Sequence, residues 1–342
     1  MRSRAEDGGE DATAGDGVRV LFTLDPYTTA GGGSVSFARV LAEALPAEGA
    51  RVTFDPRAAV DAVLAFAQHA TPALLARHRR RGARVVHRLD ERLDAAESWR
   101  RSLKHRRIAR LNAAADLTVF QSEFVRANVG PICRAPASRV IHNGVDGRVF
   151  RPEGDRVALE GAPTALHVSW SVGASKRLDR IGELLAAGPA GLRVYCAGRH
   201  VESGQPWLGD PRVVVLGPRD RDAIAALMRS ADFLFFPSEL EPCPNTPIEA
   251  MAVGLPCLYH PSGGTPELLG DAGVALGPRL ADDLRRLLAE RGRLRERALA
   301  RAAQFTAARA AARYAAAIRD AIDMPAGRPP PRLRTLWNLL GI

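Results

Sequence analysis

Lysine is almost absent from this chain of 342 residues. Lys104 and Lys176 are its only two lysines, so arginine supplies nearly all of the 48 basic side chains and of the net charge of +10. The arginines are scattered, apart from the runs 77–81 and 100–110, and this scatter argues against a nucleic-acid-binding protein. The two runs are either solvated helix faces or a positive surface that attracts an anionic substrate or lipid headgroups.

Cysteine and long apolar runs are scarce as well. Cys133, Cys196, Cys243 and Cys257 form neither a C-x-x-C motif nor a metal-ligand spacing, which favours a reducing, cytoplasmic environment. We expect Cys243 to be a small packing residue, because the sequence places no base beside it. No apolar run reaches the roughly 18 residues that a membrane span requires. The acidic, glycine-rich residues 1–17 lack an apolar stretch, so we expect a disordered tail rather than a signal peptide.

Short apolar strands alternate with helices, and this alternation runs through the chain twice. The expected strands are 18–24, 51–54, 62–66, 83–87, 117–120, 140–142, 165–170, 192–197, 213–216 and 232–236, and the expected helices are 34–45, 72–80, 97–114, 176–187, 220–230, 247–253 and a helical region over 281–324. Such alternation predicts parallel sheets with helices on both faces. The two rounds are separated by the polar segment 151–163. We therefore predict an α/β fold with two doubly wound, Rossmann-like domains that face each other across a cleft, where such sheets bind ligands.

The most informative motif is a Pro-rich turn that carries Glu241 and Glu249 between an apolar strand and a helix. Such a turn can hold a sugar nucleotide, because the helix end attracts phosphate and the carboxylates accept hydrogen bonds from sugar hydroxyls. Two alternatives remain open. Thr246-x-x-Glu249 has the form of a capping box, with Pro247 at the first helical position. The two carboxylates could also be the acid and base of a glycosidase.

A glycine loop and a lysine stand at two other strand-to-helix connections. The missing side chains of Gly31–Gly33 would let backbone N–H groups approach a diphosphate. The loop is not a G-x-G-x-x-G dinucleotide fingerprint, however, and a flexible connection is the alternative. Lys176, at the predicted start of a helix, could neutralise a diphosphate through a contact worth roughly 1.5–3 kcal/mol. An ordinary exposed lysine is the alternative.

Charged residues also follow one strand and begin one helix. His87, Arg88 and Asp90 come after a predicted buried strand, so we expect them to emerge at its carboxyl end, where active sites gather. A surface Arg–Asp pair is the alternative. Asp220 and Asp222 have the D-x-D form that can hold a metal ion, but they lie in a first helical turn, where acids offset the helix dipole. We favour the dipole and predict no metal site.

Together these motifs resemble the retaining glycosyltransferases of family 4, which have the two-domain GT-B fold. The resemblance covers roughly 18–322 and is most specific from Asp232 to Gly273. This part contains Ala-Asp-x4-Pro-Ser, Glu-x7-Glu, Glu-Ala-Met-Ala-x-Gly-x-Pro and Ser-Gly-Gly-Thr-Pro-Glu. Supporting matches are Gln121-Ser122, Ile141-His-Asn-Gly-Val-Asp146, Phe150-x-Pro152 and the segment 305–314.

The resemblance implies a role for most of these residues. Glu249 would bind the nucleotide ribose, Glu241 the donor sugar and Lys176 the diphosphate. The further donor-binding residues would be Gly32, Gly33, Cys243, Pro244, Asn245 and Thr246. Family members need no metal or other cofactor, so the nucleotide-diphosphate sugar is the expected co-substrate. A sugar would pass with retention to an acceptor hydroxyl, in the synthesis of glycans, cell-surface polysaccharides or glycolipids.

The resemblance also gives the expected organisation and partners. We expect a disordered tail (1–17), an N-terminal acceptor domain (18–155), a C-terminal nucleotide-sugar donor domain (160–305), a final helix that returns toward the first domain (306–324) and a Pro-rich hinge with an amphipathic tail (325–342). The acceptor would be a carbohydrate, a lipid-linked compound or a small molecule, and no nucleic acid would bind. The cytoplasmic protein could touch a membrane through the basic helix 97–114 or the tail 332–342. Docking of that tail on the protein itself is the alternative.

The chain departs from the family at two points. The family often carries an arginine five residues before the lysine, where this chain has Ser171. The histidine common in the first-domain cleft has no clear equivalent, and we rank Arg88 and Asp90 above His87 as its replacements. The expected catalytic residues are therefore Glu241, Asp90 and Arg88. These departures leave room for a non-catalytic nucleotide- or carbohydrate-binding protein, and the architecture also permits a phosphorylase or a sugar-nucleotide epimerase.

Overall fold

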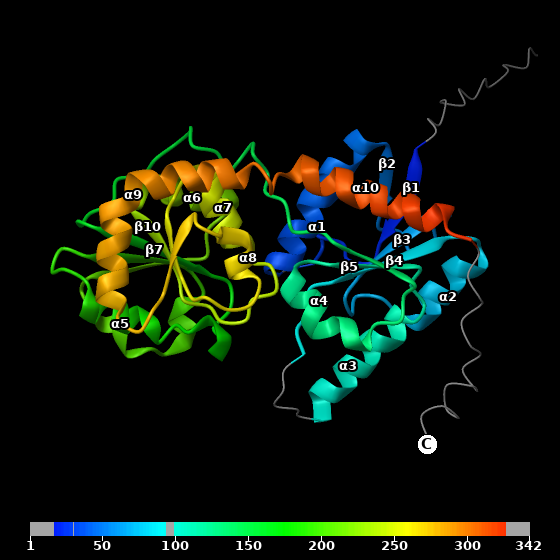
Figure 1. The fold of residues 1–342 in the computed structure, drawn as a ribbon, viewed down its shortest axis with the longest axis horizontal. Helices are drawn as coiled ribbons and strands as arrows, with labels where there is room; N and C mark the ends of the chain where they lie inside the picture. Colours follow the sequence, from blue (N-terminus) through cyan, green and yellow to red (C-terminus); the bar gives the residue numbers. More distant parts are fainter. Residues whose placement is uncertain (1–16, 30, 94–98, 326–342) are drawn as a thin grey trace, which may run out of the picture.

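The chain folds into two α/β lobes that lie side by side (Figure 1). The computed structural model describes residues 17–29, 31–93 and 99–325. The predictions for the two tails and for the first residues of the basic helix lie outside the described residues.

Each lobe contains one six-stranded parallel sheet. The strand order is β2-β1-β3-β4-β5-β6 in the first sheet and β12-β11-β10-β7-β8-β9 in the second. The strands are β1 (Val18–Phe22), β2 (Ala50–Thr53), β3 (Ala62–Phe66), β4 (Arg84–Leu89), β5 (Leu117–Phe120), β6 (Ala137–Val140), β7 (Thr164–Ser169), β8 (Arg193–Gly198), β9 (Val213–Gly217), β10 (Phe233–Phe236), β11 (Cys257–Tyr259) and β12 (Gly273–Ala275). The predicted pair of doubly wound, Rossmann-like domains is confirmed.

Helices lie above and below both sheets in the view of Figure 1. They are α1 (Gly33–Ala44), α2 (Pro72–Arg80), α3 (Trp99–Asn112), α4 (Glu123–Val129), α5 (Arg180–Ala187), α6 (Arg221–Ser230), α7 (Asn245–Val253), α8 (Thr265–Leu269), α9 (Leu280–Ala302) and α10 (Ala307–Asp323). Because helices cover both faces, the central strands are apolar throughout, and every residue of β3 and β10 is buried. Within the described residues, no helix combines the length and the apolar character that crossing a membrane requires.

Side-chain caps begin several helices where the sequence indicates. Thr71 Oγ1 accepts a hydrogen bond from the N–H of Leu74 at 3.1 Å, and α2 spans its predicted residues. Asp220 Oδ1 likewise accepts from the N–H of Ala223 at 2.8 Å at the start of α6. Such caps satisfy N–H groups that lack a partner within the helix. The carboxylate of Asp220 is thus engaged as a helix cap.

The bounds of several predicted elements differ from the structure. β4 continues two residues beyond the predicted 83–87 and ends at Leu89. The strand predicted at 140–142 is wrong, because β6 ends at Val140. The helical region 281–324 is two helices, α9 and α10, which a four-residue connection separates, and α10 corresponds to the final helix predicted at 306–324.

The chain passes between the lobes twice, and the two crossing segments are hydrogen-bonded to each other. Val145 N–H donates to Phe305 C=O at 2.8 Å, and Ala307 N–H donates to Val145 C=O at 2.9 Å. A Cβ atom on Gly144 would lie 2.6 Å from the carbonyl oxygen of Thr306. Only glycine therefore allows this close approach.

After the second crossing, α10 lies over the N-terminal lobe (Figure 1). The aromatic ring of Tyr314 is fully buried, with its centroid 5.9 Å from that of Phe37 in α1. Ala311 and Ile318 of α10 join the same apolar core. The end of the chain thus completes the core of the first lobe.

Candidate functional site

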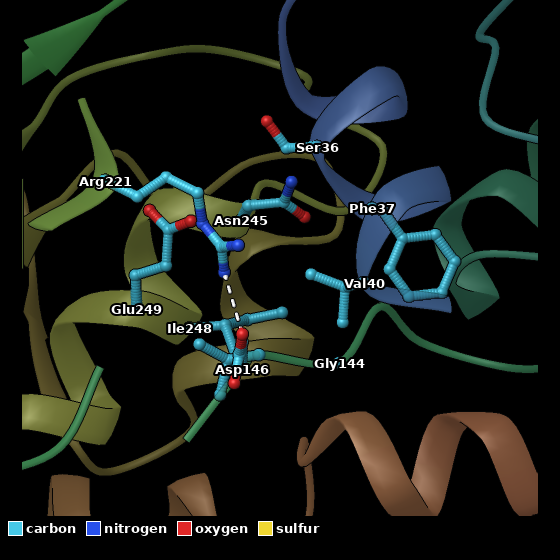
Figure 2. A pocket seen from close by; sticks show the side chains of 10 residues that line it. Ser36, Phe37, Val40, Gly144, Asp146, Arg221, Asn245, Ile248 and Glu249 are labelled. Atoms are coloured by element: carbon cyan, nitrogen blue, oxygen red, sulfur yellow. Dashed lines mark ion pairs between the residues drawn. The ribbon is translucent and has the colours of Figure 1, made fainter. Parts of the chain in front are cut away.

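The candidate site is a small cavity between the lobes. Its volume is about 10 Å³, which is roughly the space for one water molecule. Figure 2 shows α1 on one side and the side chains of Arg221, Asn245 and Glu249 on the other. The lining residues are Ser36, Phe37, Val40, Gly144, Val145, Asp146, Arg221, Asn245, Ile248 and Glu249. The two lobes are thus closed against each other at this point.

The start of α7 differs from the prediction. Asn245 is its first residue, and Pro244 precedes it without a side-chain cap. Thr246 and Pro247 therefore occupy the second and third helical positions, and the capping box is wrong. Proline is tolerated there because first-turn N–H groups have no partner within the helix. Pro244 and Thr246 lie half-buried at this helix end.

Glu249 lies in the first turns of α7, and its carboxylate reaches the cavity beside Arg221 (Figure 2). Burial raises the pKa of Glu249 to about 7, although the charge of Arg221 opposes the rise. Arg221 also lies 3.7 Å from a carboxylate oxygen of Asp146. Burial destabilises the ionised form of this carboxylate, and hydrogen bonds donated by a ligand would stabilise it.

Glu241 and Lys176 form an ion pair in which Nζ donates to Oε1 at 2.6 Å. The structure therefore brings together two residues that are 65 positions apart and that were predicted for the same site. The predicted location of Lys176 is wrong, because this residue ends a short 3₁₀ turn and α5 begins only at Arg180. The turn is followed by Arg177 in the left-handed conformation, with φ of 47°.

Arg177 is less suited than Lys176 to bind a diphosphate, because acidic side chains outside the predicted site already neutralise its charge. Its guanidinium pairs with Asp179 at 3.0 Å and also with Glu239. At Ser171, the position without the expected arginine, the backbone carbonyl accepts a hydrogen bond from Ser169 Oγ at 2.7 Å. Of the two neighbouring cations, Lys176 is the one paired with a predicted site residue.

The glycine loop meets the start of α7 across the cleft. Asn245 Nδ2 donates to the carbonyl of Gly33 at 2.9 Å. Asn143 Nδ2 in turn donates to Asn245 Oδ1 at 2.8 Å and to the carbonyl of Cys243 at 3.1 Å. A Cβ atom on Gly32 would lie 3.6 Å from the indole of Trp170 in the opposite lobe. Four of the predicted donor-site residues are thus in one network or beside it.

The thiol of Cys243 is a packing group, as the sequence predicts. The residue is 6% exposed, and burial raises the pKa of its thiol to about 12. Its Sγ accepts a hydrogen bond from the N–H of Asn143 at 3.4 Å. A thiol with such a pKa remains protonated at neutral pH and is a poor nucleophile.

Arg88 is buried within the first sheet rather than exposed at its edge. The expectation that His87 and Arg88 emerge at the strand end is wrong, because β4 continues to Leu89 and both side chains are fully buried. The guanidinium of Arg88 lies between the rings of Phe37 and Phe66, at 4.8 and 5.1 Å from their centroids. Burial lowers the pKa of His87 to about 4.

Asp90 is the residue of this group that reaches toward the glycine loop. Its carboxylate pairs with Arg88 at 2.8 Å and accepts a hydrogen bond from Ser34 Oγ. Burial alone would raise the pKa of Asp90, but Arg88 and Ser34 hold it below its ordinary value. Arg88 also donates to Asn143 Oδ1 at 3.1 Å. One chain of hydrogen bonds therefore joins the core of the first lobe to both sides of the cleft.

A carboxylate of the second lobe caps a helix of the first. Both oxygens of Glu267 accept from the N–H of Glu123, at 3.0 and 2.9 Å, and Oε1 lies 2.6 Å from Nε2 of His142. Ser122 Oγ also crosses the interface, donating to the carbonyl of Pro242 at 2.6 Å. The segment 262–267, which carries part of the sequence resemblance, thus holds the lobes together.

Replacing Glu267 with Ala is expected to lower the free energy of unfolding by about 0.5–2 kcal/mol, the usual cost of a lost helix cap. Chemical denaturation at pH 7 measures this loss. Glu123→Ala, which removes an exposed acid from the same helix end, is the control and should cost less. An equal loss in both variants would contradict a capping role for Glu267.

Two sets of lining residues escape prediction from sequence. Ser36, Phe37 and Val40 resemble any amphipathic helix in sequence, and only the arrangement of the lobes brings them to the cavity. Arg221 lies between Asp220 and Asp222, and the D-x-D motif assigns a possible role to the two acids but none to the arginine. Its position at the first residue of a helix after a strand is the available signal.

A metal site has no support in the described part of the chain, where no group of three or more His, Cys, Asp or Glu side chains is arranged to hold an ion. The D-x-D acids do not gather further ligands. Asp220 instead caps its helix.

Comparison with protein families and with curated proteins gives two findings. The family model for glycosyl transferases group 1 matches residues 170–290. The D-inositol 3-phosphate glycosyltransferase of Mycobacterium bovis (strain BCG / Pasteur 1173P2) is 32% identical over 194 residues, which cover 49% of this chain and 40% of that protein. The matched region thus spans less than half the length of that relative.

Solved structures share the fold over most of the chain. Sucrose-phosphate synthase from Thermosynechococcus elongatus superposes with a TM-score of 0.75 at 19% identity, over 89% of this chain and 99% of that chain. Anabaena HepE in complex with UDP and glucose gives 0.69 at 18% identity, over 89% and 99%. At such identities the likeness establishes the two-domain GT-B fold.

Proposed function

We propose that the protein is a retaining glycosyltransferase, because the family model for glycosyl transferases group 1 matches residues 170–290. It moves a sugar from a nucleotide-diphosphate sugar to an acceptor hydroxyl. The proposal is supported chiefly by two contacts between predicted donor residues: Lys176 pairs with Glu241, and Asn245 at the start of α7 donates to the carbonyl of Gly33 in the glycine loop. Anabaena HepE, which has this fold, was solved with UDP-glucose.

Each donor group has a partner suited to its chemistry. Lys176 neutralises the diphosphate, the start of α7 contributes its N–H groups and dipole, and Glu249 accepts hydrogen bonds from the ribose. Glu241, which neighbours Lys176 at 2.6 Å, accepts from hydroxyls of the transferred sugar. Gly32 and Gly33 close over the diphosphate from the first lobe.

The transfer needs no protein nucleophile. The bond between the anomeric carbon and the diphosphate oxygen breaks, while the acceptor oxygen bonds to the same face of that carbon. The acceptor proton passes to the leaving phosphate oxygen. The protein contributes position and charge stabilisation, and no metal is required.

The narrow cleft implies that the lobes separate when substrates bind. With about 10 Å³ of free space, a nucleotide sugar needs α1 to move away from α7. The crossing segments at Val145 and 303–306 connect the lobes and are the places where such a hinge acts. The predicted linker 151–163 instead packs on the C-terminal lobe, where Arg229 donates to the carbonyl of Asp155. Reclosure would then exclude water from the donor.

The acceptor is a carbohydrate, a lipid-linked compound or a small molecule. The basic helix α3, on which Leu103 is 54% exposed, suits peripheral contact with an anionic membrane surface. We place the protein in the cytoplasm, where nucleotide sugars are the donors.

A non-catalytic binder of nucleotides or carbohydrates is the second candidate. It is favoured by Ser171 in place of an arginine and by the engagement of Arg177 with Asp179 and Glu239. Turnover of any nucleotide sugar in a screen of acceptors would exclude it.

Lys176→Ala should reduce the thermal stabilisation that a nucleotide diphosphate gives the wild type to about half or less, because the lost contact is worth roughly 1.5–3 kcal/mol. The screen uses UDP, GDP, dTDP and ADP with their sugars, in the presence of EDTA. Ligand at about 100 times its dissociation constant adds roughly 2.7 kcal/mol of stability, which is readily seen as a rise in melting temperature.

Lys104→Ala is the matched control, because Lys104 also pairs with a glutamate, Glu91, but lies on α3. It should keep the full response. Equal responses in both variants would reject Lys176 as the diphosphate ligand. A response that appears only after Mg²⁺ is added would reject metal independence.

A further inference from the structure

A second cavity, which we call the arginine pocket, lies in the C-terminal lobe away from the cleft. Its volume is about 210 Å³, far more than one water molecule occupies. Its lining includes Asp232 and Pro256, which immediately precede β10 and β11. The carboxyl end of β10 leads to Glu241 and to the candidate donor residues at the start of α7, and β11 runs parallel to β10. The arginine pocket therefore lies at the amino ends of these strands, on the opposite side of the lobe from the candidate donor residues.

Four guanidinium groups line this pocket, with one carboxylate among the described lining residues. The arginines are Arg156, Arg229, Arg291 and Arg295. Arg291 pairs with Asp232. In the part of the chain that the structure describes, the other three arginines have no carboxylate within 4.0 Å. The lining thus carries a local excess of about three positive charges.

The unpaired arginines are held in place by backbone carbonyls. Arg229, which is 8% exposed, donates from Nε to the carbonyl of Asp155 at 2.7 Å. Arg295 donates to the carbonyls of Val253 and Gly254 at 3.3 and 3.2 Å. These contacts fix the guanidinium groups without neutralising them. A guanidinium carries five N–H donors in a planar fork that suits phosphate oxygens.

We propose that the arginine pocket is a binding site for a compact phosphorylated anion, separate from the donor site. Fixed, uncompensated guanidinium groups around one cavity are the arrangement that binds phosphoryl groups through paired hydrogen bonds. Ser230 also lines the pocket, but its hydroxyl already accepts from the N–H of Val157 and donates to the carbonyl of Ala226, so the arginines are the groups available to an anion. The alternative is that the arginines only stabilise the ends of α6 and α7 through hydrogen bonds to backbone carbonyls.

Gly292 offers a test that leaves every arginine contact intact. This residue lines the pocket from α9, and a Cβ atom there would meet nothing within 4 Å. Gly292→Glu places a carboxylate at the guanidinium groups, and Gly292→Gln is its uncharged match. Both variants are made in the Lys176→Gln background, which weakens anion binding in the cleft. Calorimetry with inorganic pyrophosphate at 0.15 M salt then measures the affinity of the arginine pocket for this anion.

Pyrophosphate should bind the Gly292→Gln protein and bind the Gly292→Glu protein about tenfold or more weakly. Hydrogen exchange should show protection at 228–231 and 253–256 rather than at 245–249. A second pair of variants makes the same comparison by removing charge. Arg156→Gln with Arg291→Gln should lose binding, whereas Arg279→Gln with Arg285→Gln, two exposed arginines on or beside α9, should retain it. Equal affinities within both pairs, or no binding to the Gly292→Gln protein, would overturn the proposal.

Discussion

Replacing Glu249 with Gln should weaken the binding of the nucleotide sugar by roughly 10- to 150-fold, while making the protein more stable at neutral pH. The loss follows from a charge-assisted hydrogen bond worth about 1.5–3 kcal/mol. The gain in stability follows from the pKa of Glu249, which burial raises to about 7. The free energy of unfolding and the nucleotide affinity, both measured across pH, test the two parts.

The sign of the stability effect follows from proton linkage. The ordinary glutamate pKa of 4.5 applies to the unfolded chain, so between pH 4.5 and 7 the folded state binds more protons than the unfolded state. The contribution of Glu249 to stability is therefore lost as pH rises through this window, and the loss is complete above about pH 7. A glutamine has no charge to lose. The difference between variant and wild type should grow from pH 4.5 to 7 and then remain constant.

Glu183→Gln is the matched control, because its side chain is 51% exposed on α5 and should change neither quantity appreciably. If Glu249→Gln destabilised the protein at pH 8, the carboxylate would have a structural role in α7. Unchanged nucleotide affinity in that variant would remove Glu249 from the proposed donor site.

The strands and most helices could be predicted because their signals are local. The fully apolar segments 62–66 and 233–236 leave little choice but a buried strand. Thr71 with Pro72 marks the start of α2 in the same way. Boundaries fail where the local signal is misleading. Pro247 resembles a first helical residue but sits at the third position, and the polar His87 and Arg88 resemble a strand end but lie inside β4.

The contacts that assemble the site could not be predicted from local pattern. The hydrogen bond from Asn143 to Asn245 spans 102 residues, and that from Asn245 to Gly33 spans 212. The resemblance to a known family marks several of these residues, but it does not reveal which touch. The burial of Arg88 between two aromatic rings likewise depends on how α1 packs on the sheet. Pairing is therefore a property of the tertiary structure.

The Asp90→Ala substitution should have the largest effect on stability, about 3–5 kcal/mol. Arg88 has no exposed surface, and its guanidinium pairs with Asp90 at 2.8 Å. Removing one partner of a buried ion pair leaves a charge without compensation, which costs far more than an exposed pair contributes. Asn143 would keep its hydrogen bond to Arg88 but cannot neutralise the charge. Urea denaturation at pH 7 measures the loss.

Two further variants show whether the loss of stability comes from the uncompensated charge of Arg88 or from the loss of packing around Asp90. Combining Asp90→Ala with Arg88→Met removes both charges and should recover much of the lost stability. Asp320→Ala breaks the exposed pair with Arg139, in which both side chains are about half exposed at 51% and 46%, and should cost about 1 kcal/mol or less. If the double variant were as unstable as Asp90→Ala alone, the uncompensated charge of Arg88 would not be the cause. A recovered but inactive double variant would indicate that the pair also serves the reaction, either directly or by positioning Ser34 and the glycine loop, because Asp90 links Arg88 to Ser34.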